Sequence, residues 1–410
     1  MTMNKYRPIF ATALLIVCLL LSATPISSSP LGEDLYKVLK NIEKNNTTLV
    51  ALRAETDARK LTNRTGITLA DPEIGYKHMQ QGGEQSGNLT ELTIGQSFDL
   101  STVLGYKSRA AESQNRLVDE EYRLVRMDIL LDAQLTYIDL AYYNALAREL
   151  ERRLTHAQQV VEAEQHRLES GDTDILAYNN VLLNLASLKA ERERIVTEQT
   201  VLTNHLTNLN GGAPLNHLES LESPDCLGYL ENPENLDSLV TQAMQYSPTM
   251  SFARTRYAAA KSDLALSKAQ QLPTLSATYI NERHTIGDRS QGVAIGVSLP
   301  LWANKNRIHS ARAALQAAQA AKTDTELQLR SQLRADYERV LGLQRTATLY
   351  RTALAEVNNT HLLTLAMNEG HISVLEYLQG IELYYDYLDR SLSAERDYHR
   401  ALAQLEAWKL

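Results

Sequence analysis

An internal repeat constrains the fold of this 410-residue chain more than any other feature of the sequence. Pro72 and Pro273 lie 201 residues apart (273 minus 72), and each precedes a segment in which apolar and polar residues alternate. The same offset aligns Ile94 with Ile295, Gly95 with Gly296, Ser97 with Ser298, Leu100 with Leu301 and Arg53 with Arg254. Because such self-similarity is the signature of a repeated structural unit, the chain is predicted to contain two similar halves.

Each half carries the pattern of a β-hairpin, at residues 72–100 and 273–301. The first hairpin turns within the polar, glycine-containing stretch 81–87. In the second, one face is apolar and the other is small or polar; the apolar set is Val293, Ile295, Val297, Leu299 and Leu301, and the other is Ala294, Gly296 and Ser298. Strands of about ten residues with two such faces fit a tilted strand that crosses a bilayer, although a hairpin covering a soluble core has the same pattern.

Most of each half is predicted to be helical. Apolar residues recur every seven positions in the first half, at Leu117, Leu124, Leu131, Ile138 and Ala145. From 104 to 168 no proline or glycine occurs after Gly105, so we expect one helix of roughly sixty residues, about 90 Å long. We expect it to turn at Gly171 and to return antiparallel as a coiled-coil partner. The second half repeats this design with helices over 311–367 and 374–408.

The N-terminal residues have the order of a secretory signal peptide, which we expect at 1–29. Lys5 and Arg7 precede an apolar run at 9–23, and small residues follow through Ser29. An uncleaved anchor is the alternative, but a run of roughly fifteen residues is short for a helix that spans a bilayer, which needs about 20.

The mature chain is then expected to have three parts. These are a first repeat at 30–209, a linker at 210–235 rich in glycine and proline, and a second repeat at 236–410. Since Cys18 lies within the signal, Cys226 is the only remaining cysteine, which excludes an intrachain disulfide.

Charge and motifs exclude several classes of function. The net charge of −8 is spread over the chain, and its charged residues occur in runs of mixed sign such as 148–153. A nucleic-acid-binding surface would instead be basic and clustered. The histidines have no paired metal-ligand spacing, and Asp172-x-Asp174 lacks the glycine and distal glutamate of a calcium loop. We therefore predict that the protein is not an enzyme and has no catalytic, cofactor-binding or metal-binding residues.

The strand count implies an assembly. Four short strands cannot close a barrel, and an open sheet facing lipid would leave its edges unpaired. Three copies would supply twelve strands, continuous with a cylinder of helices. The predicted fold class is therefore mainly α with a small β part: long antiparallel coiled-coil helices and two β-hairpins per protomer, assembling as a trimer into a 12-stranded β-barrel and an α-helical tunnel.

Several short motifs, in this order and spacing, resemble the TolC-like family of outer-membrane efflux proteins. They are Gly-Val-Ser-Leu-Pro-Leu-Trp at 296–302, Gly-Gln-Ser-Phe-Asp-Leu at 95–100, Glu-Ser-Gly-Asp at 169–172 and Asn-Glu-Gly-His-Ile-Ser-Val-Leu-Glu at 368–376. The resemblance covers nearly all of the chain after the signal. It implies a homotrimeric channel in the outer membrane that extends into the periplasm and contacts outer-membrane lipid.

The resemblance also implies partners and site residues. A periplasmic adaptor (membrane fusion) protein would dock at the helical tips, at Gly171, Asp172, Gly370 and His371. An inner-membrane pump would supply energy and select the cargo. Glu376 occupies the position of an acidic gate residue, although Gln379 stands where a second acid is found in some members.

Two other classes of function remain open from the sequence. One is a periplasmic coiled-coil scaffold whose hairpins dock proteins, and the other is an enzyme that uses the helices as a spacer. If the chain is a channel, the lumen-facing strand residues are expected to include Thr93, Ser97, Ala294 and Ser298.

Overall fold

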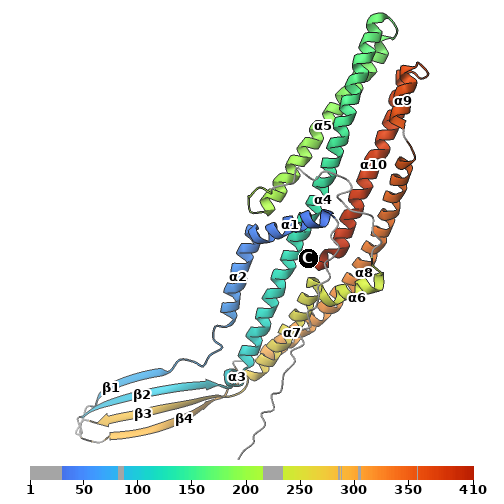
Figure 1. Ribbon diagram of the computed structural model, residues 1–410. Helices are drawn as coiled ribbons and strands as arrows, with labels where there is room; N and C mark the ends of the chain where they lie inside the picture. Colours follow the sequence, from blue (N-terminus) through green and yellow to red (C-terminus); the bar gives the residue numbers. More distant parts are fainter. Residues whose placement is uncertain are drawn as a thin grey trace, which may run out of the picture.

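The molecule is long and narrow, with a β-sheet at one end and two helical tips at the other (Figure 1). The computed structural model describes residues 30–81, 87–215, 234–284, 287, 289–302, 306–357 and 359–410. The expected signal peptide and residues 216–233 of the expected linker lie outside the described residues.

The strands form one antiparallel sheet in the order β1-β2-β3-β4. The four strands are β1 (Glu73–Gln81), β2 (Gly87–Asp99), β3 (Thr274–His284) and β4 (Arg289–Ser298). Each predicted hairpin segment supplies two neighbouring strands, and β2 pairs with β3 over its length from Leu89 to Asp99. This pairing joins the two halves of the chain, which leaves β1 and β4 as the free edges of the sheet.

Helices build the remainder of each half. The first half contains α1 (Pro30–Asn45), α2 (Thr47–Asn63), the short α3 (Leu100–Val103), α4 (Tyr106–Ser170) and α5 (Ile175–Leu209). The second half contains α6 (Leu236–Tyr246), α7 (Pro248–Ala269), α8 (Arg307–Ala355), α9 (Asn359–Asn368) and α10 (Val374–Glu406), followed by a 3-10 turn at Ala407–Lys409. The prediction of a mainly helical fold with a small antiparallel sheet is confirmed.

One long helix matches the sequence-based expectation and the other differs from it. The long helix of the first half begins directly after Gly105, which has a left-handed backbone (φ 73°) and separates it from α3. The helix expected over 311–367 is two helices, because α8 ends at Ala355 and α9 begins at Asn359. The N–H of Val357 bonds to Leu354 O at 3.4 Å, a three-residue spacing that tightens and ends the last turn.

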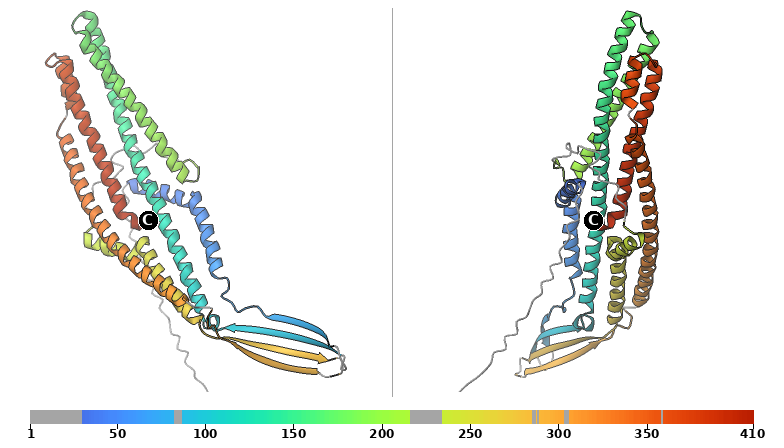
Figure 2. Two further views of the ribbon diagram at one scale, coloured as in Figure 1. Left: turned by 180° about the vertical axis from the view of Figure 1, so that it is seen from behind. Right: turned by 45° about the vertical axis from the view of Figure 1, so that its right-hand side comes forward.

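The helices follow the order of the strands. Along the bundle, α2 packs against α4, α4 against α7, and α7 against α8. The returning helices α5 and α10 pair with α4 and α8 respectively, so each half ends in an antiparallel helical hairpin (Figure 2). The helix α4 has 65 residues and is therefore about 98 Å long, the longest rod in the described chain.

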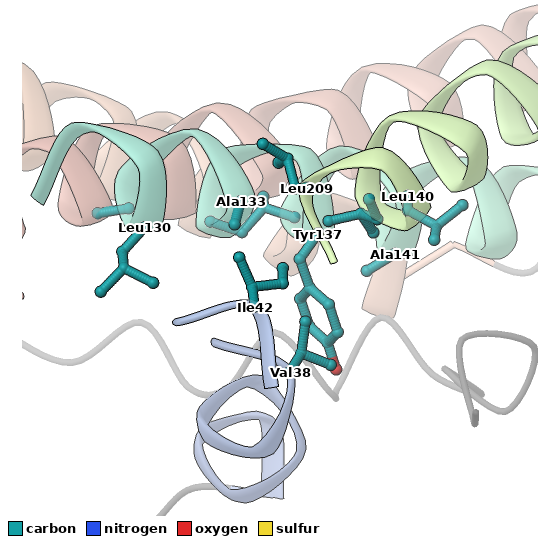
Figure 3. Packing of buried hydrophobic residues seen from close by; sticks show 11 residues of the cluster. Val38, Ile42, Leu130, Ala133, Tyr137, Leu140, Ala141 and Leu209 are labelled. Carbon is teal, nitrogen blue, oxygen red and sulfur yellow. The ribbon is translucent and has the colours of Figure 1, made fainter. Parts of the chain in front are cut away.

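Apolar clusters hold these rods together at several heights. Near the middle of α4, Tyr137 is buried against Ile42 of α1 and Leu206 of α5. Figure 3 shows Val38 and Ile42 facing Tyr137 in this cluster. A second cluster joins α6, α8 and α10 around Leu239, Val340 and Tyr398, so both halves have a core of their own.

Candidate functional site

The strand register divides the sheet into two faces of different chemistry, because directly opposed residues on neighbouring strands point to the same side. One face is apolar over most of its area and exposed: Ile295 is 81% exposed and Val293 is 71% exposed. Its apolar members are Ile74, Tyr76, Leu92, Ile94, Phe98, Leu275, Ala277, Tyr279, Val293, Ile295 and Val297. A soluble protein would cover such a face, so its exposure marks a surface for lipid or protein.

The opposite face is mostly small and polar. The four residues expected to face a lumen, Thr93, Ser97, Ala294 and Ser298, all lie on it. Apolar exceptions are Met79, Leu89 and Ile280, and the charged members are Glu73, Lys77, Glu91, Asp99, Glu282 and His284. Carboxylates outnumber lysines and arginines here, so the face is acidic at neutral pH.

Two glycines on the small face make room for cross-strand neighbours. A Cβ on Gly75 would lie 2.5 Å from Thr93 Oγ1, and a Cβ on Gly296 would lie 2.5 Å from Ser276 Oγ. Both approaches occur between cross-strand neighbours on the small face. A Cβ on Gly292, on the same face, would have no atom within 4 Å, so the close approach is confined to these two positions.

The two tips have the same backbone structure. Gly171 (φ 81°) ends α4 and Gly370 (φ 73°) follows α9, and both have the left-handed conformation that glycine adopts without penalty. The N–H of Asp172 donates to Arg167 O at 2.8 Å, and the N–H of His371 donates to Ala366 O at 2.8 Å. All four predicted tip residues are exposed, and both tips lie at the end of the molecule away from the sheet (Figure 1).

Glu376 lies in the first turn of α10 and forms a capping box. Its carboxylate accepts hydrogen bonds from the N–H and the hydroxyl of Ser373, both at 2.8 Å, while its own N–H donates to Ser373 Oγ at 3.2 Å. The backbone N–H of Ser373, followed by its hydroxyl, holds the pKa of Glu376 below its usual value. Our sequence analysis missed this cap, although Ser-Val-Leu-Glu matches the S-x-x-E signature. Glu376 is exposed, so the cap leaves its charge in contact with solvent.

The two helical hairpins are joined just behind the tips by an apolar cluster. Val160 and Val181 of the first hairpin pack with Met367, Tyr377 and Ile381 of the second. Within the second hairpin, Gly380 of α10 allows close packing against α9, since a Cβ there would lie 2.8 Å from a methyl group of Leu363.

An ion pair between a buried arginine and a half-exposed aspartate links the hairpins farther from the tips. The guanidinium of Arg153 on α4 donates to both carboxylate oxygens of Asp389 on α10, at 2.6 and 3.0 Å. It also lies 4.3 Å from the ring centre of Tyr385, and the residue is only 5% exposed. No sequence motif pointed to this pair, because its members are 236 residues apart.

Among the described residues, no helix is both long enough and apolar enough to cross a membrane. Within the same part of the chain, no group of three or more histidine, cysteine, aspartate or glutamate side chains could hold a metal ion.

Comparisons with solved structures identify the fold. A membrane protein from Pseudomonas aeruginosa superposes with a TM-score of 0.73 at 18% identity, over 92% of this chain and 93% of that chain. The outer membrane protein VceC from Vibrio cholerae gives 0.68 at 17% identity, over 92% and 94%. The CmeC outer membrane channel of Campylobacter jejuni gives 0.68 at 13% identity, over 92% and 85%.

The chain has the fold of the TolC-like outer-membrane channels. The predicted resemblance is confirmed at this level. No family model matches the sequence, and no curated protein matches it significantly. The likeness to TolC-like channels therefore lies in the three-dimensional arrangement, at identities too low to carry more than the fold.

Proposed function

We propose that this protein is the outer-membrane channel subunit of a tripartite efflux or export system. The observation that carries the proposal is the two-faced sheet, one face of which is apolar and exposed and the other small and polar. Such a sheet is stable in a bilayer only when its edges are paired and its polar face surrounds water. The fold shared with VceC and CmeC supports the same reading.

The free edges of the sheet make a ring of copies the simplest assembly. The strand β1 lies at one edge and β4 at the other, so one copy can pair head to tail with the next. Three copies of a four-stranded sheet give the twelve-stranded barrel, and the helices of each copy continue its wall toward the periplasm. The protein is then a homotrimeric, passive conduit across the outer membrane and the periplasm, and not an enzyme.

The exposed tips are the proposed contact with a periplasmic adaptor, which connects the conduit to an inner-membrane pump. Gly171, Asp172, Gly370 and His371 stand at the far end of the rods, where they are accessible in each copy. A photo-crosslinking residue at position 172 or 371 should capture the adaptor in cells, and one at the exposed Lys189, on the side of α5, should not. Equal capture at all three positions would contradict docking at the tips.

Membrane fractionation tests the conduit itself. The full chain is expressed with residues 1–29, the outer membrane is isolated and extracted in mild detergent, and light scattering gives the protomer number. We expect a trimer from the outer-membrane fraction. A soluble monomer or dimer would overturn the proposal and favour the periplasmic coiled-coil scaffold.

A further inference from the structure

A row of basic and hydroxyl side chains crosses the apolar face of the sheet at its hairpin end, far from the helices. In register, His78 of β1 lies opposite Thr90 of β2, Thr90 lies opposite Arg283 of β3, and Arg283 lies opposite Arg289 of β4. His78 Nδ1 is 3.3 Å from Thr90 Oγ1. The row therefore places two arginines side by side on a face that is otherwise largely apolar.

The pairing of Arg283 with Arg289 has no counter-charge among the described residues. Like charges directly opposite each other destabilise a sheet. Both arginines are exposed, and neither forms an ion pair or hydrogen bond with any described residue. Glu282, which precedes Arg283, lies on the opposite face of the sheet, and Asp288, which precedes Arg289, lies outside the described residues. Two neighbouring guanidinium groups without an anion among the described residues fit an anion supplied from outside.

The position of the arginine row along the strands indicates where that anion would lie relative to the membrane. Eight residues separate Val297, in the apolar row nearest the helices, from Arg289, which corresponds to about 27 Å along the strand. At a strand tilt of about 40°, the distance along the membrane normal is about 21 Å, close to the apolar band of about 25 Å in outer-membrane barrels. The arginines then lie at the level of the lipid headgroups on the side away from the helices.

The residues just below the row support this placement. Tyr76 lies on the same face one row below the arginines, in register with Leu92, and Tyr279 lies two rows below them, in register with Val293. The hydroxyl of Tyr279 accepts a hydrogen bond from Asn281 Nδ2 and donates one to Gln291 Oε1, both at 3.3 Å. Amphipathic rings and amides in this order are typical of the boundary between hydrocarbon and headgroups.

We propose that Arg283 and Arg289 form a binding site for the phosphate groups of phosphorylated lipids in the leaflet that surrounds the hairpin end of the sheet. The inference rests on the proposed membrane location of the channel. A guanidinium presents paired donors that match two phosphate oxygens, and the bound phosphate removes the repulsion between the arginines. The Thr90 hydroxyl, one position along the row, can donate a further hydrogen bond.

Lipid titration of the detergent-purified trimer tests the site. The probes are a bisphosphorylated glycolipid, the same glycolipid after enzymatic removal of its phosphates, and inorganic phosphate. We expect the phosphorylated form to bind at least about tenfold more tightly than the dephosphorylated form, and the double variant Arg283→Gln/Arg289→Gln to lose this preference. Lys77→Gln, which removes a positive charge from the small, polar face, is the matched control and should retain it.

Three results would overturn the proposal: no preference in the wild-type trimer, an unchanged preference in the double variant, or competition by inorganic phosphate at the same concentration as lipid. The last would assign the arginines to a free anion. Single-channel conductance is recorded on the same preparations, so the two proposals fail separately. A conducting trimer without lipid preference disproves only the arginine site, whereas a preparation that neither trimerises nor conducts disproves the channel.

Discussion

At the scale of single residues, the tip of the second helical hairpin is held by hydrogen bonds in which Glu376, the proposed gate residue, takes part. Ser373 and Glu376 bond to each other through three hydrogen bonds, and Gly370 provides the left-handed turn before them. The carboxylate of Glu376 therefore has a structural role in the isolated protomer. An effect of its charge on ions in the pore can be tested separately from the cap, because the Ser373 hydroxyl takes part only in the cap, whereas the Glu376 carboxylate also carries the charge.

Ser373→Ala removes the cap but keeps the carboxylate, whereas Glu376→Gln removes the charge. We expect Ser373→Ala to destabilise the start of α10 by about 1 kcal/mol, measured as faster amide hydrogen exchange at 374–377, with unchanged ion selectivity. We expect Glu376→Gln to lower the preference for cations over anions in bilayer recordings, because a ring of carboxylates attracts cations. Equal selectivity in both variants and the wild type would contradict a gate role for Glu376.

A buried histidine predicts how stability depends on pH. His399 of α10 is surrounded by protein, and its burial, together with the nearby charge of Arg351 on α8, lowers its pKa to about 4. Arg351 in turn bonds to Glu395 at 2.9 Å. In the unfolded chain the histidine takes up a proton near pH 6.5, so its contribution to stability is present above that pH and is lost as the pH falls toward 4.

We expect the thermal unfolding temperature to fall between pH 6.5 and about 4, with up to about 3 kcal/mol of stability lost through His399. His399→Gln, which does not titrate, should make this part of the profile flatter. The measurement is a series of thermal unfolding curves at constant ionic strength. An identical slope in the variant would show that other groups, such as Glu395, determine the acid sensitivity.

At the scale of helices and strands, the sequence predicted the elements that depend on local signals, namely hydrophobic periodicity and the positions of glycines. The alternating segments became strands, and Gly171 and Gly370 became the tips. Heptad residues predicted only part of the core: Ile138 and Ala145 are buried, but Leu117 is half-exposed in the single protomer, whereas its neighbour Val118 is buried. The break after Ala355 was not predicted, because no proline or glycine marks it.

Contacts between elements that are distant in sequence were beyond the sequence analysis. Duplication predicted two hairpins, but nothing in either hairpin specifies that β2 pairs with β3. The ion pair of Arg153 with Asp389 was missed for a similar reason, since either residue alone is an ordinary charged residue in a helical pattern. Such pairs depend on the geometry with which two helical hairpins dock.

The docking of the two helical hairpins predicts that a substitution at Asp389 lowers the stability of the protein. Asp389→Asn leaves the buried guanidinium of Arg153 with only Glu149, at 3.6 Å, as an acidic partner. We expect the free energy of unfolding to fall by roughly 2 kcal/mol, because a buried charge loses a bidentate hydrogen-bonded partner. Thermal or chemical unfolding of the trimer measures the change.

A nearby pair supplies the control for this experiment. Asp386 bonds to Arg390 at 3.0 Å within α10, where both side chains are exposed, so Asp386→Asn should cost less than about 0.5 kcal/mol. In the double variant Arg153→Met/Asp389→Asn, the buried charge is gone, and most of the lost stability should return. Equal losses of stability in Asp386→Asn and Asp389→Asn would show that the ion pair between the helical hairpins contributes no more than an exposed surface pair.

At the scale of the whole molecule, the two-faced sheet, the exposed tips and the free strand edges all lack a partner in a single protomer. In the proposed channel the apolar face contacts lipid, the edges pair with β4 and β1 of further copies, and the tips face away from both. A trimeric channel satisfies the faces and the edges together, whereas a scaffold would need docked proteins to cover the apolar face. Adjacent residues of β4 therefore distinguish the two models, because they point to opposite faces.

Ile295→Arg and Ala294→Arg introduce the same side chain at neighbouring positions. If Ile295 faces lipid near the membrane midplane, its arginine variant should cost about 2–4 kcal/mol in each protomer and greatly reduce the amount of trimer in the outer membrane. Ala294→Arg, on the small, polar face, should assemble normally and lower the single-channel conductance by narrowing the lumen. Quantitative outer-membrane fractionation and bilayer recording measure both effects. The reverse result would mean that the small face contacts lipid, and normal solubility and oligomeric state in both variants would favour a scaffold, since neither face would then contact a membrane.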